Sequence, residues 1–108
     1  MTFNVRHRWL RQEDDCEIYK AGKNYVLAVW GWATGRDIGP HNEFDTQVAV
    51  YIWGGEEPDS AEDLPRLNMS DHWTPYKGFN FAEDSDGSPD WGDYEEKLND
   101  ILDEIAVP

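Results

Sequence analysis

The sequence has little cysteine and little positive charge, and both shortages narrow the range of functions. A single cysteine, Cys16, cannot form a disulfide within the chain, and such usage is typical of a reducing compartment. Nine Lys and Arg stand against 23 Asp and Glu, which gives a formal net charge of −14. Nucleic-acid binding needs a basic surface, and a negative field repels nucleic acid and anionic membranes. We therefore expect no direct contact with nucleic acid and no membrane association.

Long apolar runs are also missing. The longest, YVLAVWGWA, has the length of a strand and falls far short of the roughly 20 residues that cross a bilayer. The first residues, MTFNVRHRWLR, lack the apolar core of a signal peptide. Together with the lone cysteine, these features predict a cytoplasmic protein, located in the host cytoplasm if a phage encodes it.

Residues that carry catalytic or metal chemistry are equally scarce. His7, His41 and His72 lie far apart in the sequence and lack the ligand spacing of a zinc site. Cys16 has acidic neighbours, which suppress the reactive thiolate. A phosphate-cradling loop and the Gly-x-Ser-x-Gly motif are both missing from the sequence. We predict a protein that is not an enzyme and uses no metal or cofactor.

Aromatic residues, by contrast, are plentiful. The chain has six Trp, five Tyr and four Phe in 108 residues. Side chains of this size bury large areas, which argues against intrinsic disorder. A chain of this length has room for one hydrophobic core, so we predict a single domain over residues 1–108.

Patterns of alternating, β-branched and aromatic residues predict four strands. Within the first, His7 and Trp9 fall on the buried face. Arg6 and Arg8 fall on the other face, where we expect them to pair with the chain's own carboxylates, either at residues 13–15 or on the acidic C-terminal segment. The four predicted strands are residues 2–12, 16–20, 25–32 and 44–53.

Residues 54–86 are harder to assign. SAEDLPRL predicts one helical turn with Ser60 as its N-cap. WTPYKGFNF is compatible with a short extended piece, and the rest is assigned to a loop. One face of the sheet is expected to bear Trp53, with Trp30 and Trp32 as further candidates. Either the loop containing Trp73, Tyr76, Phe79 and Phe81 folds over this face, or the face is a contact surface.

The last segment has the pattern of an amphipathic helix. Ser88 is its predicted N-cap and Pro89 its first helical residue. Apolar residues recur at three- and four-residue steps and form one buried face, while carboxylates occupy the opposite face. We predict an α+β fold in which this helix packs on one face of an antiparallel sheet of about four strands. The apolar positions are Trp91, Tyr94, Leu98, Ile101, Leu102 and Ile105.

The negative charge is concentrated in one half of the chain. Residues 1–54 hold six basic and seven acidic residues, whereas residues 55–108 hold three basic and sixteen acidic ones. A concentrated field selects cationic partners, whereas solubility alone would spread the charge more evenly. Carboxylates at three- and four-residue steps on a helix are about 4.5–6 Å apart along its axis, comparable with phosphates along a nucleic-acid strand. Because such like charges destabilise an isolated helix, we expect them to serve a partner.

These features favour a small acidic inhibitor that blocks a nucleic-acid-handling protein by offering carboxylates in place of phosphates. Phage anti-defence proteins of the anti-CRISPR and anti-restriction types work in this way. The sequence contains no motif of such a family, so the analogy concerns the physical mechanism alone. The expected partner is a basic-surfaced protein such as a nuclease or a nucleic-acid-binding effector, and the chain is expected to be a monomer or a weak homodimer. The expected contact residues are Asp84, Asp86, Asp90, Asp93, Glu96, Asp100, Asp103, Glu104, Trp53 and Trp73.

Three alternatives remain open. An immunity protein that neutralises a nuclease toxin would use the same charge. Residues 84–95, DSDGSPDWGDYE, resemble the ligand spacing of an EF-hand loop, although Pro89 stands where that loop needs glycine, and they favour a calcium-dependent module or a small enzyme. A structural or dimerising subunit would instead use the Trp-rich sheet face.

Overall fold

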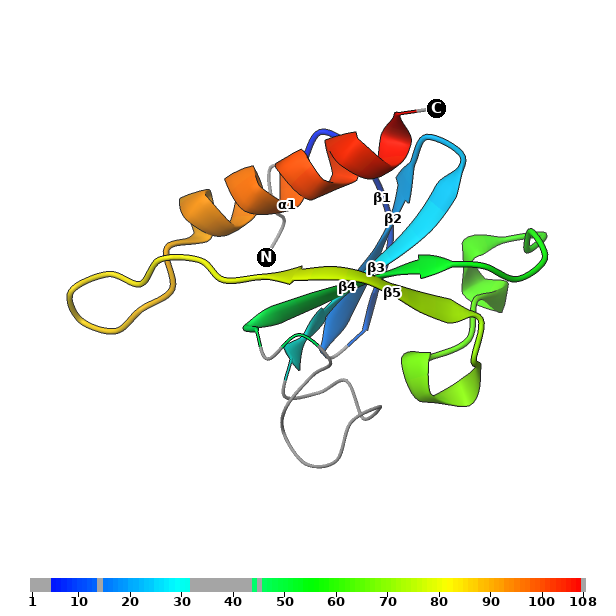
Figure 1. Ribbon diagram of the computed structural model, residues 1–108, viewed down its shortest axis with the longest axis horizontal. Coiled ribbons are helices and arrows are strands. Elements are labelled where there is room, and N and C mark those ends of the chain that lie inside the picture. Colours follow the sequence, from blue (N-terminus) through cyan, green and yellow to red (C-terminus); the bar gives the residue numbers. More distant parts are fainter. Residues whose placement is uncertain (1–4, 14, 32–43, 45, 108) are drawn as a thin grey trace.

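In the computed structural model, which describes residues 5–13, 15–31, 44 and 46–107, five antiparallel strands form one sheet (Figure 1). One α-helix, α1, lies across one face of this sheet. The predicted α+β arrangement is confirmed, with one strand more than expected. The strands are β1 (Arg8–Glu13), β2 (Cys16–Ala21), β3 (Asn24–Trp30), β4 (Val48–Trp53) and β5 (Trp73–Phe79), and the helices are η2 (Ala61–Asp63), η3 (Leu67–Met69) and α1 (Trp91–Ala106).

Each strand pairs with the next one along the chain, in the order β1-β2-β3-β4-β5. A two-residue turn joins β2 to β3, and Gly22 in this turn has a φ of +61°, which glycine adopts without strain. A Cβ atom at Gly22 would lie 3.0 Å from the carbonyl oxygen of Ala106. Glycine therefore allows the end of α1 to approach this hairpin closely.

α1 presses its apolar face against the sheet. Leu98 and Leu102 are fully buried and pack in one cluster with Val26 of β3 and Val50 of β4. The predicted buried face of the helix is thus confirmed. Trp30, considered for the opposite face of the sheet, packs on this helix-covered face, and Trp32 lies outside the described residues.

The start of α1 differs from the prediction. Asp90 is the N-cap, and its carboxylate accepts a hydrogen bond from the Asp93 amide at 3.2 Å. The prediction of Ser88 as N-cap and Pro89 as first helical residue was wrong, because Pro89 forms an isolated antiparallel bridge with Glu83. The residues before Asp90 thus form a turn next to the start of the helix. Asp90 accepts a hydrogen bond from one of the backbone N–H groups that have no partner within the helix.

The opposite face of the sheet is covered by residues 60–73. Leu64 and Leu67 are buried there in one cluster with Tyr51 of β4 and Trp73. The covering-loop prediction is therefore correct for Trp73. It was wrong for Tyr76, Phe79 and Phe81, which pack in the cluster under α1. Ser60 is the N-cap of η2, which confirms the predicted helical turn. The short extended piece predicted for residues 73–81 is confirmed, because Trp73–Phe79 follow the covering segment as β5 and pair with β4.

β1 departs from a regular edge strand. Its pairing with β2 shifts register between Trp9 and Arg11, and Leu10 joins the cluster under the covering segment. A β-bulge of this kind inserts one extra residue into a strand, and it changes the direction of the neighbouring side chains. Trp9 is 53% exposed, so its predicted place on a buried face was wrong.

We predict that Trp73→Ala destabilises the protein by about 3–5 kcal/mol, because it removes a fully buried ring and leaves a cavity. Trp9→Ala, the matched change at a half-exposed tryptophan, should cost about 1 kcal/mol or less. Urea unfolding followed by far-UV circular dichroism measures both. Equal costs for the two variants would contradict the burial described for Trp73.

Candidate functional site

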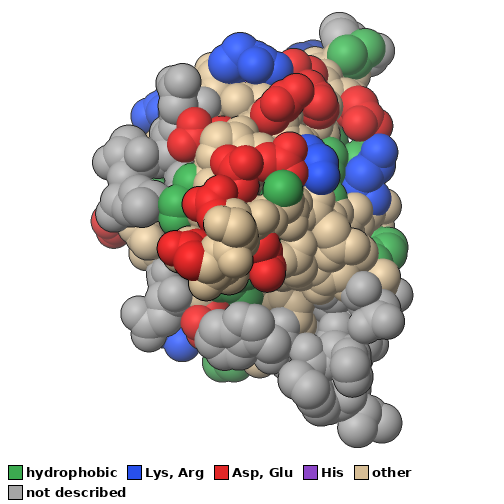
Figure 2. Space-filling model, turned by 90° about the vertical axis from the view of Figure 1, so that its left-hand side faces the viewer, with side chains coloured by type: hydrophobic (Ala, Val, Ile, Leu, Met, Phe, Trp, Pro, Cys, Tyr) green, Lys and Arg blue, Asp and Glu red, His purple; other side chains and the backbone are tan. Residues whose placement is uncertain are grey.

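Carboxylates gather at the end of the molecule that carries the turn of residues 83–89 and the start of α1 (Figure 2). We define the outer carboxylates as Asp84, Asp86, Glu96 and Asp100. All four residues are exposed, and none of them makes an ion pair with a cation in the described part of the chain. Glu96 and Asp100 are one helical turn apart on α1, about 6 Å along its axis.

The turn that presents two of these residues is held by its own backbone. The Asp84 amide donates to the Ser88 carbonyl at 2.7 Å, and the Gly87 amide donates to the Asp84 carbonyl at 2.9 Å. The Asp86 carboxylate accepts from the Ser88 amide at 3.0 Å, and this bond lowers the pKa of Asp86. Gly87, with a φ of +86°, completes the turn.

Asp93 is a structural residue. Its carboxylate accepts from the Ala82 amide at 2.7 Å and pairs with Lys97 at 3.2 Å. The Ala82 bond first, and then Lys97, lower the pKa of Asp93. Lys97 in turn donates to the Asn80 carbonyl at 2.8 Å. Asp93 and Lys97 together hold the segment after β5 against the helix. Asp93 is therefore not one of the outer carboxylates.

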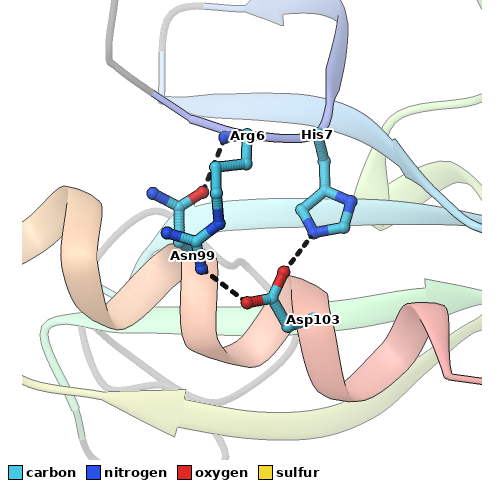
Figure 3. Close-up of polar contacts among 4 residues, drawn as sticks. All are labelled: Arg6, His7, Asn99 and Asp103. Atoms are coloured by element: carbon cyan, nitrogen blue, oxygen red, sulfur yellow. Dashed lines mark hydrogen bonds and ion pairs between the residues drawn. The ribbon is translucent and has the colours of Figure 1, made fainter.

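Asp103 is held by two residues that precede β1 (Figure 3). His7 Nε2 lies 2.7 Å from one carboxylate oxygen, and the Arg6 guanidinium donates to the other. The His7 bond first, and then Arg6, lower the pKa of Asp103. The Arg6 amide also donates to the buried Asn99 side chain at 2.7 Å. The predicted internal pairing is confirmed for Arg6, whereas the exposed Arg8 has no ion pair with a described residue.

Glu104 is likewise occupied. Lys77 of β5 pairs with its carboxylate at 2.9 Å, and the Tyr76 hydroxyl donates to it at 3.1 Å. Lys77 first, and then Tyr76, lower the pKa of Glu104. Of the eight carboxylates predicted for a partner, Asp93, Asp103 and Glu104 are bound by the chain's own cations and Asp90 caps the helix. The remaining four are the outer carboxylates.

The two tryptophans predicted as anchors lie elsewhere. Trp73 is fully buried, and its indole N–H donates to the Pro65 carbonyl at 2.9 Å, so it is not available to a partner in this structure. Trp53 is half-buried, with its ring centroid 5.0 Å from that of Trp73. Trp53 ends β4 and pairs with Trp73 at the beginning of β5, whereas the turn of residues 83–89 follows the other end of β5 (Figure 1). The structure therefore does not bring Trp53 and Trp73 close to the outer carboxylates.

A different aromatic cluster lies beside the acidic turn. Trp30, Phe81, Trp91 and Tyr94 have neighbouring ring centroids 5.3–6.1 Å apart. Trp30 and Trp91 remain half-buried. The helix period placed Trp91 and Tyr94 on one face, but the sequence alone gave no signal that Trp30 and Phe81 would meet them.

Glu17 is an acidic residue that the sequence analysis did not single out. It lies on β2 beneath the helix with only 6% of its surface exposed, and its carboxylate accepts a hydrogen bond from the Tyr19 hydroxyl. Burial raises the pKa of Glu17, and the Tyr19 bond opposes this effect. Burial and the neighbouring Glu17 carboxylate also raise the pKa values of Tyr19 and Tyr94.

The described residues show neither a cluster of metal ligands nor a membrane-spanning helix. No three of their His, Cys, Asp and Glu side chains are grouped so as to hold a metal ion, and this includes residues 84–95. None of the described helices has the length and apolar character needed to cross a bilayer. Comparisons of the chain with protein-family models, curated proteins and solved structures found no match.

Glu17→Gln should stabilise the protein at neutral pH. The folded-state pKa of Glu17 is raised, so the ionised carboxylate destabilises the fold above that pKa, and the penalty disappears below the unfolded value of about 4.3. Glutamine keeps an acceptor for Tyr19 without the charge. Urea midpoints of both proteins between pH 4 and 8 test this. An advantage that grows as the pH falls would contradict it.

Asp103→Asn should loosen the segment before β1. Because the pKa of Asp103 is lowered, its stabilising contribution is present above the unfolded value of about 3.9 and is lost as the pH falls through the folded value. At pH 7 we expect faster hydrogen exchange at the Arg6 amide and unchanged exchange at Leu98. Asp100→Asn is the matched control, and an equal effect of that variant would show that general charge is responsible.

Proposed function

We propose that this chain is an acidic binding protein, not an enzyme, that blocks a nucleic-acid-handling protein by presenting carboxylates in place of phosphates. The partner is a basic-surfaced protein in the cytoplasm, such as a nuclease or a nucleic-acid-binding effector. The contact is made by the outer carboxylates, which lie on α1 and on the turn that precedes it.

The observation that carries this proposal is the contrast between two groups of carboxylates. Asp93, Asp103 and Glu104 are bound by the chain's own cations, which fasten α1 to neighbouring segments. Glu96 and Asp100, on the same helix, make no such contact with a described residue. Packing therefore explains the first group and leaves the charge of the second without a structural role.

The field at this end of the molecule suits a groove that has evolved to bind phosphates. Lys and Arg side chains in such a groove are spaced for a polyanion, and complementary charge speeds association and fixes register. Exposed carboxylates in high dielectric contribute modestly to affinity and are screened by salt. The complex should therefore form fast and depend strongly on salt, with its residence time set by apolar contacts near the row.

The anti-defence and immunity forms of this function share the same surface chemistry. Both need a negative row that fits a cationic site on a nucleic-acid enzyme. They differ in the partner alone, which is a defence effector in the first case and a toxin in the second. Identification of the partner decides between them.

The Glu96→Lys/Asp100→Lys variant should fold normally and bind the partner at least tenfold more weakly, with a smaller salt dependence. The partner is captured from a cell lysate on the immobilised chain, purified, and measured by calorimetry at several salt concentrations. Duplex DNA should compete with the wild-type chain for this partner.

Asp59→Lys/Glu62→Lys provides the matched control, because it makes the same change in net charge at two exposed positions, one just before the covering segment and one within it. This control should retain most of the affinity. Equal affinity of the Glu96→Lys/Asp100→Lys variant and the wild type, or failure of duplex DNA to compete, would refute the proposed function.

A further inference from the structure

The turn of residues 83–89 carries a chemically reactive pair at its tip. Asp86–Gly87 is the one Asp-Gly pair in the sequence, and an Asn-Gly pair does not occur. An aspartate followed by glycine can rearrange without an enzyme, because glycine has no side chain to shield its backbone nitrogen from the aspartate carboxyl group. The rearrangement concerns the backbone, whereas the proposed function uses the charge of Asp86 alone.

The structure leaves this pair open to solvent. Residues 82–89 are all exposed, and the turn projects beyond the sheet at the left of Figure 1. A Cβ atom built at Gly87 would meet no atom of the described residues within 4 Å, apart from its chain neighbours. The tip therefore has room for a new ring and access for the water that opens it. Exposed turn tips are also places where a fold opens locally at little cost.

Hydrogen bonds within the turn restrain the two reacting groups. The Gly87 amide donates to the Asp84 carbonyl at 2.9 Å, and the Asp86 carboxylate accepts from the Ser88 amide at 3.0 Å. The Ser88 bond also lowers the pKa of Asp86 and so favours the ionised carboxylate, which the nitrogen attacks less readily than the neutral acid. Reaction therefore needs these bonds to open, and an exposed turn opens far more often than a buried segment does.

We propose that Asp86 converts spontaneously to isoaspartate in the native protein, so that the turn changes as the protein ages. The Gly87 nitrogen attacks the side-chain carboxyl carbon of Asp86, a carbon–nitrogen bond forms, the nitrogen loses its proton, and water leaves. The product is a cyclic imide. Water then opens one of its two carbonyl groups and gives either aspartate or isoaspartate. One water molecule is released and one is consumed, so no other reactant is needed.

Isoaspartate keeps its carboxylate but lengthens the main chain by one methylene group at residue 86. The bonds of the Gly87 and Ser88 amides depend on the spacing along this chain, so we expect both to be lost. Two of the outer carboxylates, Asp84 and Asp86, are then no longer held in place, whereas those on α1 are unaffected. The chemistry itself does not depend on the proposed function.

The test is incubation of the purified chain at neutral pH and body temperature for several weeks, followed by peptide mapping with mass spectrometry. Isoaspartate should accumulate at Asp86. In the aged protein, hydrogen exchange of the Gly87 and Ser88 amides should become faster, while that of Leu98 stays the same. A synthetic peptide of residues 82–90 should convert about tenfold faster than the folded chain, because it lacks the hydrogen bonds of the turn.

Two variants separate ring formation from general damage. Asp86→Asn forms the same imide with loss of ammonia, so it should convert faster than the wild type, with the change in mass from an amide to an acid. Asp86→Glu keeps the charge but needs a larger and less favourable ring, so it should stay unmodified. Asp59 and Asp84, each followed by serine, are internal controls.

Three outcomes would overturn the proposal. If Asp86→Asn keeps its amide while the peptide reacts, the turn prevents ring closure in the native protein. Isoaspartate at Asp59 or Asp84 as fast as at Asp86 would show that Gly87 has no particular effect. Unchanged hydrogen exchange at Gly87 and Ser88 after conversion would refute the effect on the turn. The proposed function is tested separately by partner binding, so failure of one leaves the other standing.

Discussion

The packing of α1 on the sheet determines both the core and the charge of this protein. A helix that buries one face must present the other to solvent, and here the buried face is aliphatic and aromatic while the outer face is almost wholly acidic. Carboxylates on the flanks of the helix meet neighbouring segments, and the chain supplies Lys77, Lys97, Arg6 and His7 to hold them. Carboxylates on its crest meet none of the described cations. The division between structural and outer acids is therefore a consequence of how one helix sits on one sheet.

In the proposed function, the exposed carboxylates steer the encounter with the partner. Exposed carboxylates act over a distance and lose strength with salt, so they govern encounter more than residence. Glu17, by contrast, is buried in the free protein. The structure offers both kinds on the two sides of the same helix, with aromatic rings near the buried one.

The sequence predicted the elements that depend on local pattern. The period of three and four residues placed Leu98 and Leu102 correctly, and the composition around Ser60 predicted the turn there. It also indicated an extended piece at residues 73–81, which contain β5, but it did not predict that this piece joins the sheet. β5 contains Pro75 and Gly78, which weaken the sequence pattern of a strand. Its pairing with β4 depends on tertiary contacts, which local sequence does not reveal.

The same reason explains the errors in the candidate site. Asp93, Asp100 and Asp103 all fall on the predicted outer face of the helix, and only the contacts with Ala82, Arg6 and His7 distinguish Asp93 and Asp103 from Asp100. Glu17 sits in a strand among residues that gave no sign of its burial, because burial there comes from the helix about 80 positions later in the chain.

The bonds of Arg6 and His7 to Asp103 join positions 97 and 96 residues apart, nearly the whole chain. A ribosome releases the beginning of a chain long before its end. The segment before β1 therefore cannot make this attachment until the last turns of α1 have been synthesised. Before that, Asp103 cannot hold the segment in front of β1, and one face of the sheet lacks the helix that covers it.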